Sequence, residues 1–233
     1  MKLHVGTSGY SYKEWKGSFY PEKLPAKEML PYYASKLSAV ELNNTFYRLP
    51  QPSMVESWKS QVPDSFRFSV KASQRITHFK RLKDAEAETK YMLDTVGALN
   101  EQLGVVLYQL PPNMKKDSER LKTFVAHLPA EIPAAFEFRH PTWFDDEVLD
   151  TLRNRNLALC ISDTDDLPVS HIDRTAEWGY LRLRRVNYSQ ADLEEWWKKI
   201  GGQNWTTAFV FFKHEDEGTG PRLARDFLDI AAA

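Results

Sequence analysis

Cysteine is almost absent from this chain, because Cys160 is the only one among 233 residues. A single thiol excludes an intrachain disulfide and any metal cluster built from several cysteines. Cys160 lies within an apolar run, Leu157 to Asp163, where a thiol behaves as a small core residue more often than as a nucleophile. We therefore expect Cys160 to pack in the core.

Net charge is nearly absent as well, since 31 basic and 32 acidic side chains leave a formal charge of -1. This balance excludes a global attraction to nucleic acid or to an anionic membrane, so any affinity for anions has to come from a local cluster. Apolar runs long enough to span a bilayer are missing, and Met1 to Gly6 lacks the parts of a signal peptide. We expect a cytoplasmic protein without a membrane partner, and the residues identify no protein partner.

Linkers are missing too, because no Gly/Ser-rich stretch, low-complexity tract or internal repeat divides the chain. A hydrophobic content of 42% is enough to bury one sizeable core. We expect a single domain over residues 1–233.

What the chain does contain is a recurrence of eight short β-type runs, nearly all followed by a helical pattern. The runs are Leu3 to Gly6, Val40 to Asn43, Phe66 to Lys71, Val105 to Leu110, Ala134 to Arg139, Leu157 to Asp163, Gly179 to Arg184 and Ala208 to Phe212. Strands that alternate with helices pair in parallel, and eight such units close a (β/α)8 barrel. The sequence therefore predicts a TIM-type barrel whose site lies at the mouth formed by the carboxyl ends of the strands.

The spacing of apolar residues predicts the helices that form the outer layer of this barrel. Helices are expected at about 26–37, after Pro52 with Ser53 and Glu56 as a capping box, from Asp84 to about Leu103, and at 118–127, 145–154, 189–200 and 222–230. The sixth run is the exception, because Asp165-Asp166-Leu167-Pro168 is typical of a loop. The helix after the sixth strand is therefore expected to be short or missing.

Alternation along the runs predicts which side chains face the barrel interior, since the apolar face packs on the helices. The residues assigned inward or to the strand ends are Glu41, Asn43, Arg67, Ser69, Lys71, Gln109, Glu137, Arg139, Asp163, Tyr180, Arg182 and Arg184. Five of these are basic and three are acidic, which leaves an excess of two positive charges. Buried charges must pair, reach water or await a ligand.

Two interpretations follow from this inward charge. It is either an internal ion-pair layer that only sets strand register, or a site for an anionic or polyhydroxylated ligand. Under the second interpretation, the expected ligand-binding residues are Asn43, Lys71, Gln109, Arg139, Arg182, Arg184, Tyr10 and Trp143, and the expected acid/base residues are Glu41, Glu137 and Asp163. The aromatics Tyr10, Tyr12, Trp15, Phe46, Tyr47 and Trp143 lie in mouth loops, where they either stack on a ligand or act as core lids.

Other functions stay open at this point. His78, His140 and His214 lie near strand ends and suggest a metal-dependent phosphodiesterase, although no close metal-ligand pair is present and no metal residues are assigned. Glu41 and Glu137 also fit the carboxylate pair of a glycosidase. A non-catalytic interaction barrel is a further alternative, and no cofactor is indicated. If the protein is an enzyme, we expect a hydrolase acting on a phosphorylated substrate.

Several motifs together resemble one known family. They are Gly6-Thr7-Ser8-Gly9-Tyr10 with Trp15 and Phe19-Tyr20-Pro21, the run from Val40 to Pro50, Phe66 to Lys71 with Ile76-Thr77-His78, Gln109-Leu110-Pro111-Pro112, Glu137-Phe138-Arg139-His140 with Trp143, and Asp163. In these residues the chain is similar, nearly end to end, to the YecE-like domain-of-unknown-function family 72. The resemblance implies a TIM-type barrel and no established reaction. A structural likeness of some members to endonuclease IV type enzymes has suggested nucleic-acid binding by analogy.

The second half of the chain departs from the family pattern at two places. Such proteins usually show Arg-Leu-His-Gly where this chain has Arg182-Leu183-Arg184-Arg185, and Phe-Asn-Asn where it has Phe212-Lys213-His214. Both changes fall at the expected mouth and add positive charge. A ligand carried over from the family is therefore least secure here.

Overall fold

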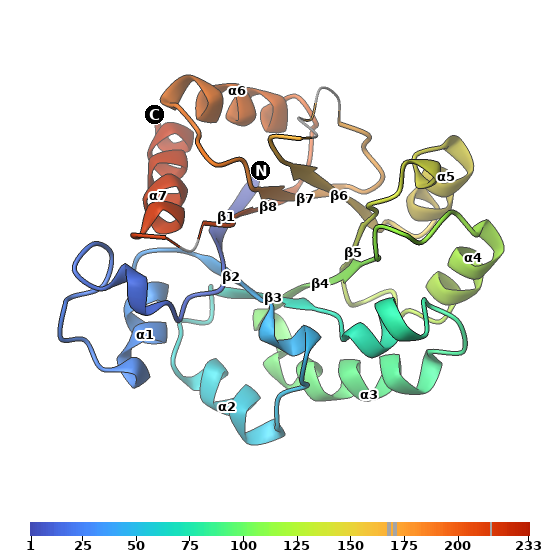
Figure 1. Cartoon of the computed structure of the whole chain (residues 1–233), viewed down its shortest axis with the longest axis horizontal. Coiled ribbons are helices and arrows are strands. Elements are labelled where there is room, and N and C mark those ends of the chain that lie inside the picture. The colour runs from blue at the N-terminus through green and yellow to red at the C-terminus, as the bar shows by residue number, and fades with distance from the viewer. Residues whose placement is uncertain (167–168, 170–171, 215) are drawn as a thin grey trace.

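Eight parallel strands close into a barrel in the computed structural model, which describes residues 1–166, 169, 172–214 and 216–233 (Figure 1). The strands are β1 (Lys2–Ser8), β2 (Ala39–Leu42), β3 (Arg67–Lys71), β4 (Leu103–Gln109), β5 (Ala134–Glu137), β6 (Ala158–Asp163), β7 (Trp178–Leu183) and β8 (Thr207–Phe212). Each strand pairs with the next, and β8 returns to β1. The predicted (β/α)8 fold is confirmed.

Helices surround the strands in a ring, as Figure 1 shows. They are α1 (Met29–Ala34), α2 (Pro52–Ser60), α3 (Glu86–Val96), α4 (Ser118–Ala126), α5 (Asp146–Arg153), α6 (Gln190–Gly201) and α7 (Thr219–Ala232). The ring is open between α5 and α6, where the described residues between β6 and β7 form no helix. This agrees with the sequence prediction, although Leu167 and Pro168 of the expected loop lie outside the described residues.

Several helix ends differ from their predictions, among them α1, which is shorter than the expected 26–37, and α7, which begins at Thr219 instead of residue 222. The helix expected from Asp84 to Leu103 runs from Glu86 to Val96 and is followed by a 3-10 segment, Gly97–Gln102, which is kinked at Asn100, where φ is 52°. The capping box expected at Ser53 is absent, since Pro52 with its restricted φ is already the first helical residue. A true capping box forms at Ser189, where α6 begins.

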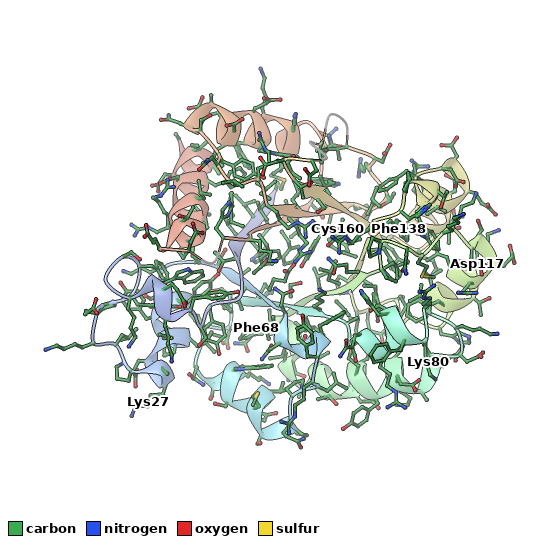
Figure 2. All side chains as sticks on the ribbon, viewed as in Figure 1. Lys27, Phe68, Lys80, Asp117, Phe138 and Cys160 are labelled. Atoms are coloured by element: carbon green, nitrogen blue, oxygen red, sulfur yellow. The ribbon has the colours of Figure 1, made fainter. Side chains whose placement is uncertain are left out.

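The apolar core has an inner and an outer part. Inside the barrel, Cys160 packs with aromatic side chains of β7 and β8, among them Tyr180 and Phe211, as its labelled position in Figure 2 indicates. Burial raises the pKa of the Cys160 thiol well above its ordinary value. Two larger clusters lie between the strands and the helices.

Among the described residues, no helix combines the length and the apolar character needed to cross a bilayer.

The close approach of β1 to β2 depends on a glycine. Gly6 pairs with Ala39, and a Cβ atom at Gly6 would lie 1.8 Å from the Ala39 carbonyl oxygen. Only a residue without a side chain fits there. Two residues further on, the same register places Ser8 opposite Glu41, at the carboxyl ends of both strands.

Candidate functional site

The centre of the mouth is an ion pair that spans the barrel. The Arg182 guanidinium on β7 lies 2.8 Å from Glu41 Oε1 on β2 and 2.6 Å from Glu137 Oε2 on β5. The three residues are only 2%, 0% and 1% exposed, respectively. Two buried carboxylates therefore share one buried cation, which ties strands on different sides of the barrel together.

Further hydrogen bonds fix Glu41 in this ion pair. The Ser8 hydroxyl donates to Glu41 Oε1 at 2.7 Å, the Tyr180 hydroxyl donates to Oε2 at 2.7 Å, and Asn43 Nδ2 lies 3.1 Å from Oε1. Burial by itself would raise the pKa of Glu41, but Arg182 and these hydroxyl groups outweigh it and lower the pKa to about 2. The carboxyl group is therefore ionised at neutral pH.

Glu137 is held in the same way. Burial opposes ionisation, and the charges of Arg182 and Arg184 together with a hydrogen bond from Gln109 lower its pKa below the ordinary value. Register places Gln109 directly opposite Glu137 on neighbouring strands. Neither Glu41 nor Glu137 holds a proton to donate at neutral pH, so this geometry gives no support to a general-acid role for either.

A second layer of cations lies around this ion pair. Lys71 Nζ stands 4.2 Å from the centre of the Phe46 ring, and Arg184 Nη2 lies 3.9 Å from Glu137 Oε1. Lys213 follows β8 directly and is exposed. Burial lowers the pKa of Lys71 to about 8, with repulsion from Arg182 and Lys213 adding to the effect and attraction from the two glutamates opposing it. These groups therefore act on one another electrostatically.

A pocket opens beside this second layer. It has a volume of about 490 Å³ and is lined by Thr164, Arg184, Val186, Lys213, His214 and Asp216, which follow β6, β7 and β8. The His214 ring is buried against the loop after β7, with Nε2 2.5 Å from the Arg185 carbonyl oxygen. A somewhat larger pocket of about 580 Å³ lies between α3 and α4, on the outer face of the barrel. Only the first pocket borders the charged mouth.

Asp163 belongs to a separate cluster. Its Oδ2 accepts hydrogen bonds from Arg185 Nε at 2.7 Å and from the Tyr188 hydroxyl at 2.8 Å. Arg185 also lies 3.4 Å from Asp192 at the start of α6. Asp163 therefore anchors the loop between β7 and α6, and the arginine that departs from the family pattern at position 185 is its partner.

Two of the five basic residues assigned inward lie elsewhere. Arg67 is the first residue of β3, at the opposite end of the barrel, where its Nη1 donates to the carbonyl oxygens of Asp64 and Phe66. Arg139 comes two residues after the end of β5 and is exposed. Arg67 does face inward, because it pairs with Ala39 of the inner cluster, but it lies away from the mouth. Arg139 lies beyond the last residue of β5, so strand alternation does not place it, and its ligand-binding role stays a prediction.

Two aromatic residues expected to bind a ligand face the shell outside the barrel. Trp143 is 0% exposed, its indole N–H donates to the Met114 carbonyl oxygen at 2.7 Å, and its ring stacks on Phe138 with centroids 4.8 Å apart. Tyr10 packs in the outer cluster, 6.2 Å from the ring of Tyr33. Both therefore cover the apolar core. This was the second of the two roles expected for the aromatic residues of the mouth loops.

The three histidines near strand ends do not meet. His78 contacts the edge of Phe46, His140 bonds to Thr142 on its own loop, and His214 faces Arg185. Within the part of the chain that the structure describes, no three His, Cys, Asp or Glu side chains are grouped to hold a metal ion.

Sequence reasoning gave no site role to Ser8 and Tyr180, although both hold Glu41. Tyr180 was placed inward by alternation, and its hydroxyl also bonds to Ser69 at 2.6 Å. Lys213 was noted only as a departure from a family pattern. Its place beside the pocket follows from the closure of β8 onto β1, which brings the end of the chain back to the mouth.

The Glu41 ion pair predicts how stability depends on pH. The pKa of Glu41 is about 2 in the folded protein, against an ordinary value of 4.5. The stabilisation by the ionised Glu41 carboxylate is therefore complete above pH 4.5 and is lost as the pH falls toward 2. We expect a loss of about 3 kcal/mol in the free energy of unfolding over that range. Urea unfolding across the acidic range measures it. Glu41→Gln should flatten the slope and Glu56→Gln, an exposed residue on α2, should not; equal slopes in the wild type and Glu41→Gln would contradict the assignment.

These features define a TIM-type barrel protein with a buried ion pair and surplus cations at its carboxyl-terminal mouth. Residues 4–233 match the family model described as "Protein of unknown function DUF72", and the chain belongs to that family. The structure is similar to a DUF72 family protein from Thermotoga maritima, with a TM-score of 0.86, 26% identity and coverage of 100% of both chains.

Curated relatives carry no activity in their names. The chain is 24% identical to the UPF0759 protein YunF of Bacillus subtilis over 92% of this chain and 79% of that protein. It is 32% identical to the UPF0759 protein YecE of Escherichia coli K12 over 66% of this chain, and the match spans 55% of that relative. These relatives support the family membership of the chain, and their names indicate no reaction.

Proposed function

We propose that this barrel binds a small anionic ligand, phosphate-like or nucleotide-like, at its carboxyl-terminal mouth. The observation that carries the proposal is the charge balance there. Glu41, Glu137 and Asp216 of the pocket wall are the carboxylates there, and Arg182, Lys71, Arg184 and Lys213 are the cations, which leaves a surplus of positive charge. An anion such as phosphate would be attracted by that surplus.

The cations differ in how far neighbouring carboxylates already neutralise them. Arg182 is buried, and both of its terminal nitrogens are paired with the two glutamates, so it serves as the floor of the site. Arg184 is only 3.9 Å from its nearest carboxylate, and its Nε has no hydrogen-bond partner among the described residues. Lys71 is repelled by its neighbours. Lys71, Arg184 and Lys213 are therefore the groups that an anion would neutralise, while Asn43 and Gln109 orient the floor.

Inorganic phosphate tests this proposal in a thermal-shift titration against chloride of equal ionic strength. A ligand present at 100 times its Kd stabilises the folded state by about 2.7 kcal/mol. Arg184→Ala and Lys213→Ala should each lose most of the phosphate-dependent increase in Tm, whereas Lys27→Gln should retain it. Lys27 is exposed and lies at the periphery, beside α1 (Figure 2).

Two results would overturn the proposal. One is no stabilisation by phosphate, pyrophosphate or sulfate relative to chloride. The other is a shift of equal size in Arg184→Ala, Lys213→Ala and Lys27→Gln, because a general salt effect would not depend on residues at the mouth.

Single-stranded nucleic acid is a second candidate, favoured by exposed aromatic side chains on the loops at the same end. Tyr47 follows β2 and is 74% exposed, Phe79 follows β3 and is 73% exposed, and Phe144 follows β5 and is 51% exposed. Aromatic rings beside cations are typical of single-strand binding. Oligonucleotide binding that weakens in Tyr47→Ala and falls with salt would support it, and indifference to both would count against it.

A further inference from the structure

Lys71 is a partly buried cation of the mouth whose Nζ contacts an aromatic ring. It is half-buried at the end of β3, with its Nζ over the face of Phe46 at 4.2 Å. No hydrogen bond or ion pair holds its Nζ within the described residues. Phe46 is itself buried, so water is kept from one side of the amine.

The surroundings of Lys71 favour the neutral amine. Burial acts first and the charge of Arg182 from β7 adds repulsion, the charges of Glu41 and Glu137 oppose both, and Lys213 after β8 adds a smaller repulsion. The resulting pKa of about 8 leaves roughly a tenth of the amine neutral at pH 7, against about one part in three thousand for an ordinary lysine. A lysine that is desolvated and beside another cation is the arrangement that activates an amine as a nucleophile.

We propose that Lys71 is a reactive amine that forms an imine with an anionic aldehyde or ketone bound in the mouth. The inference rests on the proposed function, since Arg184 and Lys213 beside the pocket would hold the anionic group. The ligand class thereby narrows to carbonyl compounds that carry a phosphate or a carboxylate.

The chemical step balances without a further reactant. The neutral amine attacks the carbonyl carbon, a C–N bond forms, and the carbonyl oxygen becomes a hydroxyl group. That hydroxyl takes up one proton from solvent and leaves as water, and the product is a protonated imine. The imine carries the same single positive charge as the lysine ammonium, so Glu41 and Glu137 compensate both.

Pyridoxal 5′-phosphate is a suitable probe, because it joins an aldehyde to a phosphate, and pyridoxal is its match without the phosphate. Borohydride delivers a hydride to the imine and leaves a stable secondary amine, which peptide mass spectrometry locates. We expect Lys71 to be the main site, labelled at least about tenfold faster by the phosphorylated aldehyde and protected by inorganic phosphate.

Two variants sharpen the test. Lys71→Arg keeps the charge and removes the amine, so it should lose this adduct. Lys27→Arg controls for an exposed lysine outside the mouth and should retain the Lys71 adduct. The mapping in the wild type is informative even where a variant fails to fold.

The outcomes separate this inference from the proposed function. Labelling at Lys213 or spread evenly over exposed lysines, with phosphate stabilisation intact, overturns the imine and leaves the anion site. Equal labelling of Lys71 by both aldehydes, without phosphate stabilisation, overturns the anionic ligand class and the proposed function with it. Preferential, phosphate-protected labelling of Lys71 supports both.

Discussion

Arg182→Met is expected to destabilise the fold by about 3–5 kcal/mol, because it leaves Glu41 and Glu137 buried without their shared cation. Urea unfolding at neutral pH measures the loss. The deficit should shrink as the pH falls, since the two carboxyl groups of the variant take up protons at a higher pH than those of the wild type.

Matched variants isolate the ion pair in this experiment. Arg184→Met removes a partly exposed arginine 3.9 Å from Glu137 and should cost less than about 1 kcal/mol. Replacing Glu41, Glu137 and Arg182 together with apolar residues of similar size should recover much of the stability, because no buried charge is then left alone. A loss below about 1 kcal/mol in Arg182→Met would show that the cluster contributes little.

Trp143→Ala is expected to cost a similar 3–5 kcal/mol while leaving phosphate affinity unchanged. The side chain is 0% exposed and stacked on Phe138, so its removal opens a cavity in the shell between barrel and helices. It also leaves the Met114 carbonyl oxygen without its 2.7 Å hydrogen bond. Urea unfolding gives the first quantity, and the phosphate-dependent increase in Tm gives the second.

Trp143→Phe serves as the control, since it keeps most of the ring volume and should lose less stability than the alanine variant. If Trp143→Ala unfolds at the temperature of the assay, the phenylalanine variant still reports phosphate affinity. A marked loss of phosphate binding in Trp143→Phe would return this residue to the ligand-binding set.

Alternation along a strand is a local property, and it predicted much of the site. Glu41, Glu137 and Arg182 were assigned inward from their apolar neighbours, and they meet inside the barrel. Alternation does not say at which end of the barrel an inward residue lies or where a strand stops. Arg67 lies away from the mouth, and Arg139 lies beyond the last residue of β5.

Contacts between distant segments were beyond such reasoning. Asp163 was expected to act with the glutamates, but Arg185 and Tyr188, 22 and 25 residues later, bind it instead. Trp143 was expected in the mouth because its loop follows a strand, yet its ring turns outward onto Phe138. Spacing along the chain gives the loop, and side-chain packing decides its direction.

The two initial interpretations of the inward charge each describe part of the molecule. Arg182 and the two glutamates form the buried ion-pair layer, and Lys71, Arg184 and Lys213 remain as the surplus above it. The surplus of positive charge was expected from one set of residues and is proposed from another, since Lys213 enters the set while Arg67 and Asp163 leave it.

By itself, the sequence determined the barrel, the absence of disulfides and the strands that turn charge inward, because β-propensity, period-two alternation and cysteine content act within short segments. The tertiary structure alone decided which charges neutralise one another. Ion pairing depends on distances of a few ångströms between strands far apart in the chain, and only the closed barrel sets those distances. That closure is what places Lys71 near the charges of two cations and two glutamates.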